Sequence, residues 1–436
     1  MNISSMKCTL GSLIGADKLS VMPDTDKDSF NRIKDLEFSF EDYRKVRDFT
    51  KFVGVTEEFT KVVHTFQNQM TDGEIPAGFR PDLMFSQDGS MRVDLARDIS
   101  YASNGRKRPT KVLYSANCAN PFEINVMKDM IANLTTNPQI IYEHFLNNPK
   151  ANIGGQFKDR FEVLEELCRI VGPGVDISVE VNNPFAPESE LMEEIARCEE
   201  ILTPYRLVVK VPHTGPLNKD NVGSFLDGNF DIPYDGGSVE DNFFGHNFAY
   251  KLSSQGYRVN FTLMFDPHQT ALALLAKPYF INAFVETRHL DTLKMKELLD
   301  KLEVTGDERY AENLKQFMIA TDVLPASSSL SLKDIAAKAR ALVAYRQTTT
   351  SEGFDGLDSV RHSLRVLRQS YLPDTKLIIC NTNYPQIYWD IDKMLMEPEF
   401  ADMIHRVVIT ATPAYFGQFT CAPGIYSYQR KFLKSV

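Results

Sequence analysis

From about Lys111 onward, the chain alternates short apolar runs with stretches in which apolar residues recur at helical spacing. This alternation is typical of βα units, which build a parallel sheet. We predict eight strands, and they cover residues 111–117, 131–136, 175–181, 207–212, 258–265, 279–285, 376–382 and 406–412. Eight parallel strands indicate an α/β fold of the closed (β/α)8 TIM-barrel type, with an active site at the C-terminal ends of the strands. A doubly wound open sheet is the alternative, but no Gly-rich GxGxxG motif follows a strand.

Residues 1–110 precede this alternation and are predicted to form a helical accessory region, with the barrel at 111–436. Residues 40–54 and 56–70 both repeat apolar residues at helical spacing, and Thr56 is a suitable N-cap for the second helix. The segment MRVDLARD (91–98) fits a short strand whose partner the sequence does not identify.

Two insertions interrupt the barrel pattern. The first, at about 215–238, directly follows the fourth strand, so it is either a lid over the barrel mouth or a passive loop. The second, at about 288–373, is mostly helical and too long for a simple connection. We therefore predict a helical insertion between strands six and seven.

Composition narrows the functional class. The chain has 43% apolar residues and a net charge of −10, without a basic stripe interleaved with aromatic residues, so it is not expected to bind nucleic acid. No apolar stretch is long enough for a signal peptide or a membrane span, which predicts a cytoplasmic protein that does not bind membranes. The six cysteines are scattered without a CxxC pair, so we expect reduced thiols and no metal.

A lysine lies at the centre of the fourth predicted strand, LVVKVPHT (207–214). Burial disfavours the charged form of an amine, and a neutral buried amine can attack a carbonyl carbon. Lys210 is thus a candidate nucleophile. The alternative is an edge strand whose lysine is solvated or paired with an acid.

Strand alternation identifies which polar residues face the same way as Lys210. Glu180 in VDISVEV, and Asn260 and Thr262 in RVNFTLMF, alternate with apolar neighbours. Together they supply what imine chemistry requires, namely an amine, a carboxylate that manages protons through water, and polar groups that orient the reactants. The alternative is a structural polar network around a Lys210–Glu180 ion pair.

These segments resemble the transaldolase and fructose-6-phosphate aldolase family, whose members are class I aldolases that hold the substrate as a Schiff base. The resemblance rests on LTTNP (134–138), SVEV (178–181), VVKVPHT (208–214), NFTLMFDPHQ (260–269) and INAFVETR (281–288), which occur in this order on successive predicted strands. It implies that Lys210 forms the imine and that Glu180 and Thr262 hold the catalytic water. It also implies no cofactor, and substrate contacts from Asn137, Asn260, Asn282, Phe284 and Arg288.

The chain departs from the family pattern at several positions. When NCANPFEI (117–124) is aligned with the first-strand segment, Asn117 replaces the aspartate that acts as acid and base in carbon–carbon cleavage. Thr382 stands where the family has a phosphate-binding arginine, and Asn282 where it has a serine. Arg288 is one residue later than the family spacing. These changes indicate a divergent member that keeps the imine and alters the later steps.

Three residues just past strands four and five are candidates for the missing acid and base, namely His213, Asp266 and His268. Each is otherwise a surface or capping residue. Asp94 is a further candidate if the first strand lies earlier than assigned.

The sequence therefore predicts a transaldolase-like Schiff-base enzyme that makes or breaks a carbon–carbon bond in a polar carbonyl substrate, such as a sugar or sugar phosphate. One alternative is a lyase or isomerase that uses the imine for dehydration or enamine tautomerisation. Another is a barrel without activity that acts as a binding protein. A homo-oligomer is compatible with each of them.

Overall fold

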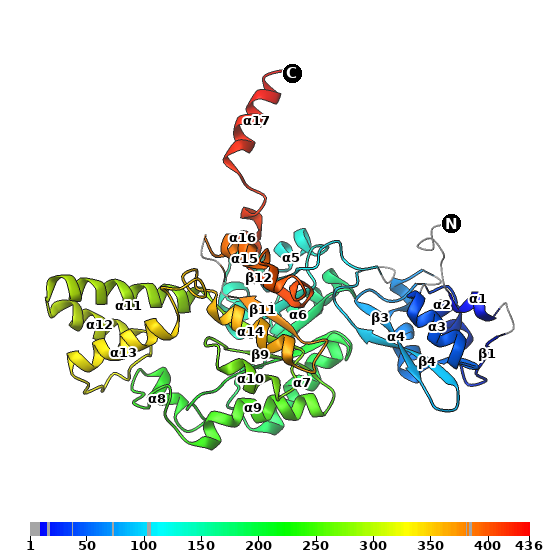
Figure 1. The fold of residues 1–436 in the computed structure, drawn as a ribbon, viewed down its shortest axis with the longest axis horizontal. Coiled ribbons are helices and arrows are strands. Elements are labelled where there is room, and N and C mark those ends of the chain that lie inside the picture. The colour runs from blue at the N-terminus through cyan, green and yellow to red at the C-terminus, as the bar shows by residue number, and fades with distance from the viewer. Residues whose placement is uncertain are drawn as a thin grey trace. The chain divides into compact units, whose positions relative to one another are not determined.

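The computed structural model describes residues 9–14, 18–36, 38–71, 74–102, 106–380, 382 and 386–436. The chain divides into two compact units (Figure 1). Unit 1 comprises Met1–Thr110 and Val171–Asp176, and unit 2 comprises Lys111–Ile170 and Ile177–Val436.

Unit 1 contains a four-stranded sheet in the order β1-β2-β4-β3, in which β3 runs antiparallel to β4 and the other neighbours are parallel. Its strands are β1 (Ser20–Val21), β2 (Phe52–Val55), β3 (Phe79–Phe85) and β4 (Ser90–Arg97). Its helices are α1 (Leu10–Ile14), α2 (Lys27–Ile33), α3 (Phe40–Phe49), α4 (Glu57–Phe66) and the short η2 (Gln67–Gln69).

The prediction of a helical region with one short strand at 91–98 is therefore incomplete: β4 confirms that strand, but it lies in a sheet with β1, β2 and β3. Thr56 caps α4 as expected, because its Oγ1 accepts a hydrogen bond from the Phe59 amide at 2.9 Å. The end of the predicted 40–54 helix instead forms β2, which pairs with β4. That pairing joins segments far apart in the sequence, which local helical spacing cannot reveal. Asp94 lies on β4 and accepts the Thr56 hydroxyl at 2.6 Å, so it belongs to this sheet and not to the first barrel strand.

Unit 2 is built on a closed barrel of eight strands, in chain order around the ring, as predicted. The strands are β5 (Leu113–Asn117), β6 (Asn133–Thr136), β7 (Asp176–Glu180), β8 (Leu207–Pro212), β9 (Arg258–Thr262), β10 (Phe280–Phe284), β11 (Lys376–Cys380) and β12 (Val407–Ala411). Each observed strand lies within a predicted one. Nearly all strand residues are buried, as expected when helices cover the outside of a parallel sheet.

Helices surround the strands and carry the connections, and the last helix, α17, projects from the barrel (Figure 1). They are α5 (Pro121–Met127), η3 (Gln139–Leu146), η4 (Ile153–Gly155), α6 (Arg160–Val171), α7 (Glu188–Leu202), α8 (Val222–Leu226), α9 (Val239–Ser254), α10 (Gln269–Leu274), α14 (Asp358–Gln369), α15 (Ile387–Leu395), η5 (Pro398–Phe400), η6 (Ile404–Arg406), α16 (Pro413–Gln418) and α17 (Pro423–Leu433). Helix α9 packs closely on the strand that bears the candidate lysine. A Cβ atom at Gly245 would approach the Pro212 carbonyl oxygen to 2.3 Å, so only glycine fits there.

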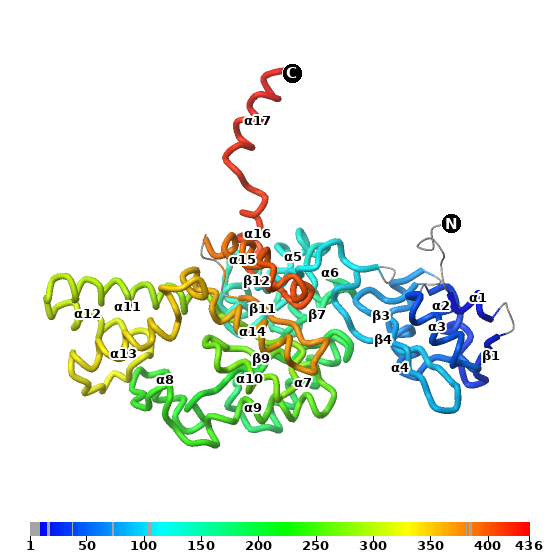
Figure 2. The backbone as a smooth tube through the Cα atoms, in the orientation of Figure 1, coloured from blue at the N-terminus to red at the C-terminus, as the bar shows by residue number. Residues whose placement is uncertain are grey.

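The helical insertion between β10 and β11 is also as predicted. It contains α11 (Glu286–Thr305), α12 (Arg309–Ala320) and α13 (Leu332–Tyr345), and these helices extend away from the barrel (Figure 2). They bury a core of their own, which includes Met295, Leu299, Leu314, Met318 and Ile335. The first insertion contains α8 and is otherwise irregular. Among the described residues, no helix combines the length and apolar character needed to cross a membrane.

Candidate active site

Lys210 lies inside the barrel, at the middle of β8, and its charge is paired. Its Nζ is 2.9 Å from Glu180 Oε2 on the neighbouring strand β7, and only 8% and 15% of the two side chains are exposed. The strands are in register at this level, so Glu180 pairs with Lys210, which in turn pairs with Asn260 on β9. Three successive strands therefore present an acid, an amine and an amide at one height in the barrel.

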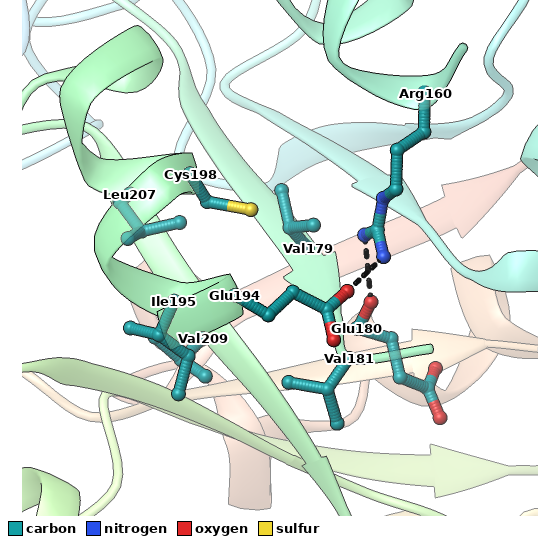
Figure 3. A pocket seen from close by; sticks show the side chains of 9 residues that line it. All are labelled: Arg160, Val179, Glu180, Val181, Glu194, Ile195, Cys198, Leu207 and Val209. Atoms are coloured by element: carbon teal, nitrogen blue, oxygen red, sulfur yellow. Dashed lines mark hydrogen bonds and ion pairs between the residues drawn. The ribbon is translucent and has the colours of Figure 1, made fainter. Parts of the chain in front are cut away.

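The strand that carries Glu180 is held from outside the barrel. Arg160, at the start of α6, donates to the Glu180 carbonyl oxygen at 2.9 Å and forms an ion pair with Glu194 on α7. Glu194 also accepts the Asn182 amide. Figure 3 shows Arg160, Glu180 and Glu194 around a small cavity between β7, β8 and α7, with the Glu180 carboxylate pointing away from it. The cavity is lined by outward-facing side chains such as Val179 and is separate from the interior that holds Lys210.

Two polar atoms beside Lys210 are buried and find no hydrogen-bond partner among the described residues. They are Asn260 Nδ2 and Thr262 Oγ1, both on β9 and both in fully buried side chains. Buried polar groups in proteins are almost always paired, because leaving one unpaired costs about 1–3 kcal/mol. Both atoms at this position are therefore free to hydrogen-bond to a ligand or a water molecule.

A short relay of hydrogen bonds fixes the orientation of Asn260. Asn282 on β10 donates from Nδ2 to the Phe261 carbonyl oxygen at 2.9 Å and to Asn260 Oδ1. Since a backbone carbonyl only accepts, Asn282 Oδ1 must face the other way, where Cys380 Sγ lies at 3.6 Å. Burial raises the pKa of the Cys380 thiol, although the nearby positive charge of Lys210 opposes this, so the thiol stays protonated and donates. The relay leaves Asn260 Nδ2 as a donor toward the pocket.

The chain beyond Thr262 turns sharply. Leu263 has a φ of 57°, a left-handed conformation that is uncommon for a residue with a side chain and often marks functional sites. Gln269 holds the turn, because its Oε1 accepts the amides of Phe265 and Asp266 at 2.7 and 2.9 Å. Phe284, at the end of β10, packs its ring on that of Phe265 with 4.8 Å between centroids. Strand β9 therefore ends in a rigid loop at the barrel mouth.

Comparison with protein families agrees with this geometry. The model of the family described as Transaldolase/Fructose-6-phosphate aldolase matches residues 118–341, just over half of the chain. The chain belongs to the transaldolase and fructose-6-phosphate aldolase family. Membership supports an aldolase-type enzyme acting on a small, sugar-like molecule.

Other comparisons add little. A crystal structure of HpcH/HpaI aldolase from Desulfitobacterium hafniense DCB-2 is 7% identical in sequence and has a TM-score of 0.30, over 74% of this chain and 93% of that one. A likeness at that level carries no argument here. A search of curated proteins finds no match to the chain.

The positions at which the chain departs from its family can now be placed. Asn117 ends β5 and is partly exposed. Thr382 is buried and donates its hydroxyl to the Thr410 carbonyl oxygen at 2.7 Å, so its side-chain donor is occupied. Asn137, a predicted substrate contact, uses its Oδ1 to accept the Ile140 amide at 2.8 Å. Of the segment 380–387, residues 381 and 383–385 lie outside the described part of the chain.

Arg288, the remaining predicted contact for a phosphate, is occupied within the protein. Its guanidinium pairs with both carboxylate oxygens of Asp358 and with Asp266 at 2.9 Å, and the side chain is almost fully buried. These bonds tie the helical insertion to the β9 loop. A substrate phosphate would have to displace two carboxylates, so the structure disfavours Arg288 as an anion-binding residue.

His213 lies on the outer side of the barrel wall and not in its mouth. Its ring stacks on Phe261 with 4.1 Å between centroids, and His246 on α9 lies nearby. Burial lowers the pKa of His213 to about 4, so the ring is neutral at pH 7. His213 lies two positions after Val211, so both side chains face the outside of the barrel. Strand alternation in the sequence therefore already predicted this orientation.

Asp266 and His268 lie in the loop after β9, where helix α13 meets it. Asp266 is occupied by Arg288 and lies 3.7 Å from Arg346. His268 is exposed, and its Nδ1 is 2.9 Å from the Tyr345 hydroxyl. Of the three predicted acid or base candidates, His268 alone is both exposed and free of a charged partner among the described residues.

Several residues of the site escaped prediction. The inward orientation of Cys380 could have been predicted from strand alternation. Cys380 lies two positions after Ile378 on β11, so the two side chains face the same side of the strand. Arg160, Asp358 and Tyr345 act through contacts across long stretches of sequence, which no local pattern reports. Among the described residues, no group of three or more metal-ligating side chains is assembled to hold a metal ion.

The buried neutral His213 predicts a pH dependence of stability. Its folded pKa of about 4 is below the ordinary value of about 6.5, so the unfolded state binds the proton more readily. The stability that His213 contributes is complete above pH 6.5 and is lost as the pH falls toward 4. Between pH 7.5 and 5.0, wild-type protein should lose roughly 2 kcal/mol more of its free energy of unfolding than His213→Gln, measured by urea denaturation.

His144→Gln, which removes an exposed histidine on η3, is the matched control and should keep the wild-type dependence. Equal pH dependence in wild type and His213→Gln would contradict the prediction.

Proposed function

We propose that the chain is a class I aldolase-type enzyme in which Lys210 forms an imine with the carbonyl of a polar, sugar-like substrate. A carbon–carbon bond next to the imine is then made or broken. The observation that carries the proposal is the 2.9 Å contact between Lys210 Nζ and Glu180 Oε2 inside the barrel, beside the unpaired donors of Asn260 and Thr262.

This pair supplies both requirements of imine formation. The ammonium passes a proton to the adjacent carboxylate, and the free amine attacks the substrate carbonyl carbon to give a carbinolamine. Glu180, now protonated, returns the proton to the carbinolamine hydroxyl, which leaves as water while the C=N bond forms. Thr262 lies two residues further along β9 than Asn260, and its Oγ1, which has no partner among the described residues, is the group that we propose for holding that water.

The relay from Cys380 through Asn282 supports a substrate rich in oxygen. It turns the amide nitrogen of Asn260, and not its oxygen, toward the interior. A nitrogen donor beside the imine carbon pairs with an acceptor, such as a hydroxyl oxygen on the neighbouring carbon. This fits a hydroxyketone better than a simple ketone.

Asn117 favours a second candidate. Cleavage of the carbon–carbon bond requires a base that takes the proton of the substrate hydroxyl while the bonding electrons move into the imine to form an enamine. An amide does not take that proton. An imine-dependent lyase or isomerase, which dehydrates the substrate or tautomerises the enamine, does not need this base at the same position. His268, hydrogen-bonded to Tyr345, is a candidate proton carrier for either reaction.

Reduction with borohydride tests the imine. Dihydroxyacetone and borohydride together should leave a covalent adduct on Lys210, located by peptide mass spectrometry, because reduction makes the C–N bond permanent. The adduct should be absent from Lys210→Met. It should persist in Lys376→Met, which removes another buried lysine, at the start of β11.

Absence of an adduct with dihydroxyacetone and with a panel of other hydroxyketones and aldehydes, in protein shown to be folded by circular dichroism, would overturn the imine and support a non-catalytic barrel.

Asn117→Asp tests whether the first strand sets the reaction. Restoring a carboxylate should raise the rate of carbon–carbon cleavage of a ketose about 100-fold, at the low end of what general acid–base catalysis contributes. Release of the aldehyde product, followed in a coupled assay, is the measurement.

Asn125→Asp introduces the same charge at an exposed position of α5, where Lys128 Nζ donates to the side-chain oxygen at 3.3 Å, and it should leave the rate unchanged. No gain in Asn117→Asp would show that the pocket has diverged beyond this position.

The relay can be tested through the rate of adduct formation at low dihydroxyacetone concentration. Asn282→Leu removes the bonds that orient Asn260 and should slow trapping about tenfold, the equivalent of one hydrogen bond. Cys380→Ala should slow it less, and Cys380→Ser, which keeps a donor, should restore it. If the alanine and serine variants behave alike, the thiol only fills space.

A further inference from the structure

The inward-facing side chains beyond Lys210 on β8, β9 and β10 carry no charge. By strand alternation Pro212 faces inward as Lys210 does, and it pairs with Thr262 on β9. Phe284 lies two positions after the inward-facing asparagine of β10, and its partly exposed ring packs on that of Phe265. This side of the barrel mouth therefore presents mostly carbon, and no cation, to a substrate that extends outward from Lys210.

Two arginines lie beside the loop after β9, and both face carboxylates. Arg288 pairs with Asp358 and with Asp266 Oδ1. Arg346, which follows α13, has its Nε 3.7 Å from the same Asp266 oxygen. Two positive and two negative charges thus balance within the protein. Arginine and lysine are the side chains that bind phosphate best, but these two arginines are already committed to carboxylates.

The first insertion extends along this end of the barrel. It begins directly after β8, and Figure 1 shows its helix α8 next to α13. Near the end of the insertion, the pKa of Tyr234 is raised by burial and by the charges of Asp235 and Asp266, so this segment lies close to the loop after β9. Lys338 on α13 lies with its Nζ 5.4 Å from the centre of the Tyr234 ring.

The insertion brings negative charge to the barrel mouth. Its single cation, Lys219, pairs with Asp220 at 2.9 Å. Three further aspartates, Asp227, Asp231 and Asp235, are exposed, and no ion pair among the described residues neutralises them. Even beside the one ammonium of α13, these carboxylates leave this surface negative. A surface of one sign lowers the local concentration of ligands that carry the same sign.

Helix N-termini are the other common phosphate sites, because their unpaired amides and the helix dipole attract anions. Four helices of the barrel that follow its strands, namely α7, α9, α11 and α15, each have an acidic residue in the first turn. These residues are Glu188, Glu240, Glu286 and Asp390. A phosphate bound at any of these helix ends would lie beside a carboxylate.

We propose that the end of the substrate remote from the imine carbon is uncharged, so the site accepts an unphosphorylated hydroxyketone and excludes sugar phosphates. The inference rests on the proposed imine at Lys210 and adds the class of substrate that the same site accepts. The neutral end lies against Pro212 and Phe284. A phosphate in that place would meet carbon on one side and aspartates on the other, with no free cation to replace the water that it gives up.

A matched pair of ketoses tests the charge. Erythrulose and its terminal phosphate ester differ only in the phosphate, and both are too short to close a stable ring, so their carbonyl groups are comparably available. With borohydride present, erythrulose should form the Lys210 adduct at least about tenfold faster than the phosphate ester, measured by peptide mass spectrometry. Dihydroxyacetone, run in parallel, reports whether the imine forms at all.

The possible outcomes separate this inference from the imine itself. Equal trapping of the two ketoses, or faster trapping of the phosphate ester, with the dihydroxyacetone adduct intact, would overturn the inference and leave the imine standing. If none of the three compounds forms an adduct, the imine is overturned and the inference falls with it.

Removing charge from the insertion tests its part in the exclusion. The triple variant Asp227→Asn, Asp231→Asn and Asp235→Asn should speed trapping of the phosphate ester about threefold at low salt and leave trapping of erythrulose unchanged. The gain should shrink at high salt, because salt screens exposed charges. An unchanged ratio between the two ketoses would overturn the part assigned to the insertion.

The matched control removes the same charge from the end of the helical insertion that lies away from the barrel. Glu303→Gln, Glu308→Gln and Glu312→Gln together replace three exposed acids at the end of α11 and the start of α12. This variant should trap both ketoses at the wild-type rates. If it speeds trapping of the phosphate ester as much as the aspartate variant does, only the net charge of the protein acts, and the local exclusion is overturned.

Discussion

The pairing of Lys210 with Glu180 inside the barrel is the constraint on which the site depends. Two charges removed from water cost several kcal/mol each unless they face one another, so neither side chain can be replaced alone without leaving a buried charge. The surroundings are arranged to keep them together. Arg160 holds the backbone of Glu180 from behind, and the register of β7 and β8 puts the two residues directly opposite.

The parts of the site that could be predicted follow from the alternation of side chains between the two faces of a β-strand. In a closed barrel every second residue of a strand faces the interior. Glu180 and Asn260 pair with Lys210 on the neighbouring strands, so they face the interior as Lys210 does. The eight strands were predictable for a related reason, since buried parallel strands are continuous apolar runs. The same rule, applied strictly, would have placed His213 outside the barrel and Cys380 inside it.

What could not be predicted depends on contacts between distant segments. Arg288 has the sequence position of a substrate contact, but Asp358, which neutralises it, lies 70 residues further along the chain. The bond between His268 and Tyr345 joins residues 77 apart. Unit 1 shows the same limit. The sequence pattern places part of β2 in a helix, because it does not reveal that β2 pairs with β4. The local sequence pattern predicts which face of a strand or helix a residue occupies, but not which distant residue it contacts there.

Together these findings separate the two halves of the proposed reaction. The groups that we propose for imine formation lie on β7, β8 and β9, within the range matched by the family model. The groups that would serve the later step differ, because Asn117 lacks an acid and Arg288 is already neutralised by Asp358 and Asp266. Conversely, helix α13 brings Tyr345 to His268 at the end of the β9 loop. The helical insertion therefore contributes directly to the loop after β9 at the barrel mouth.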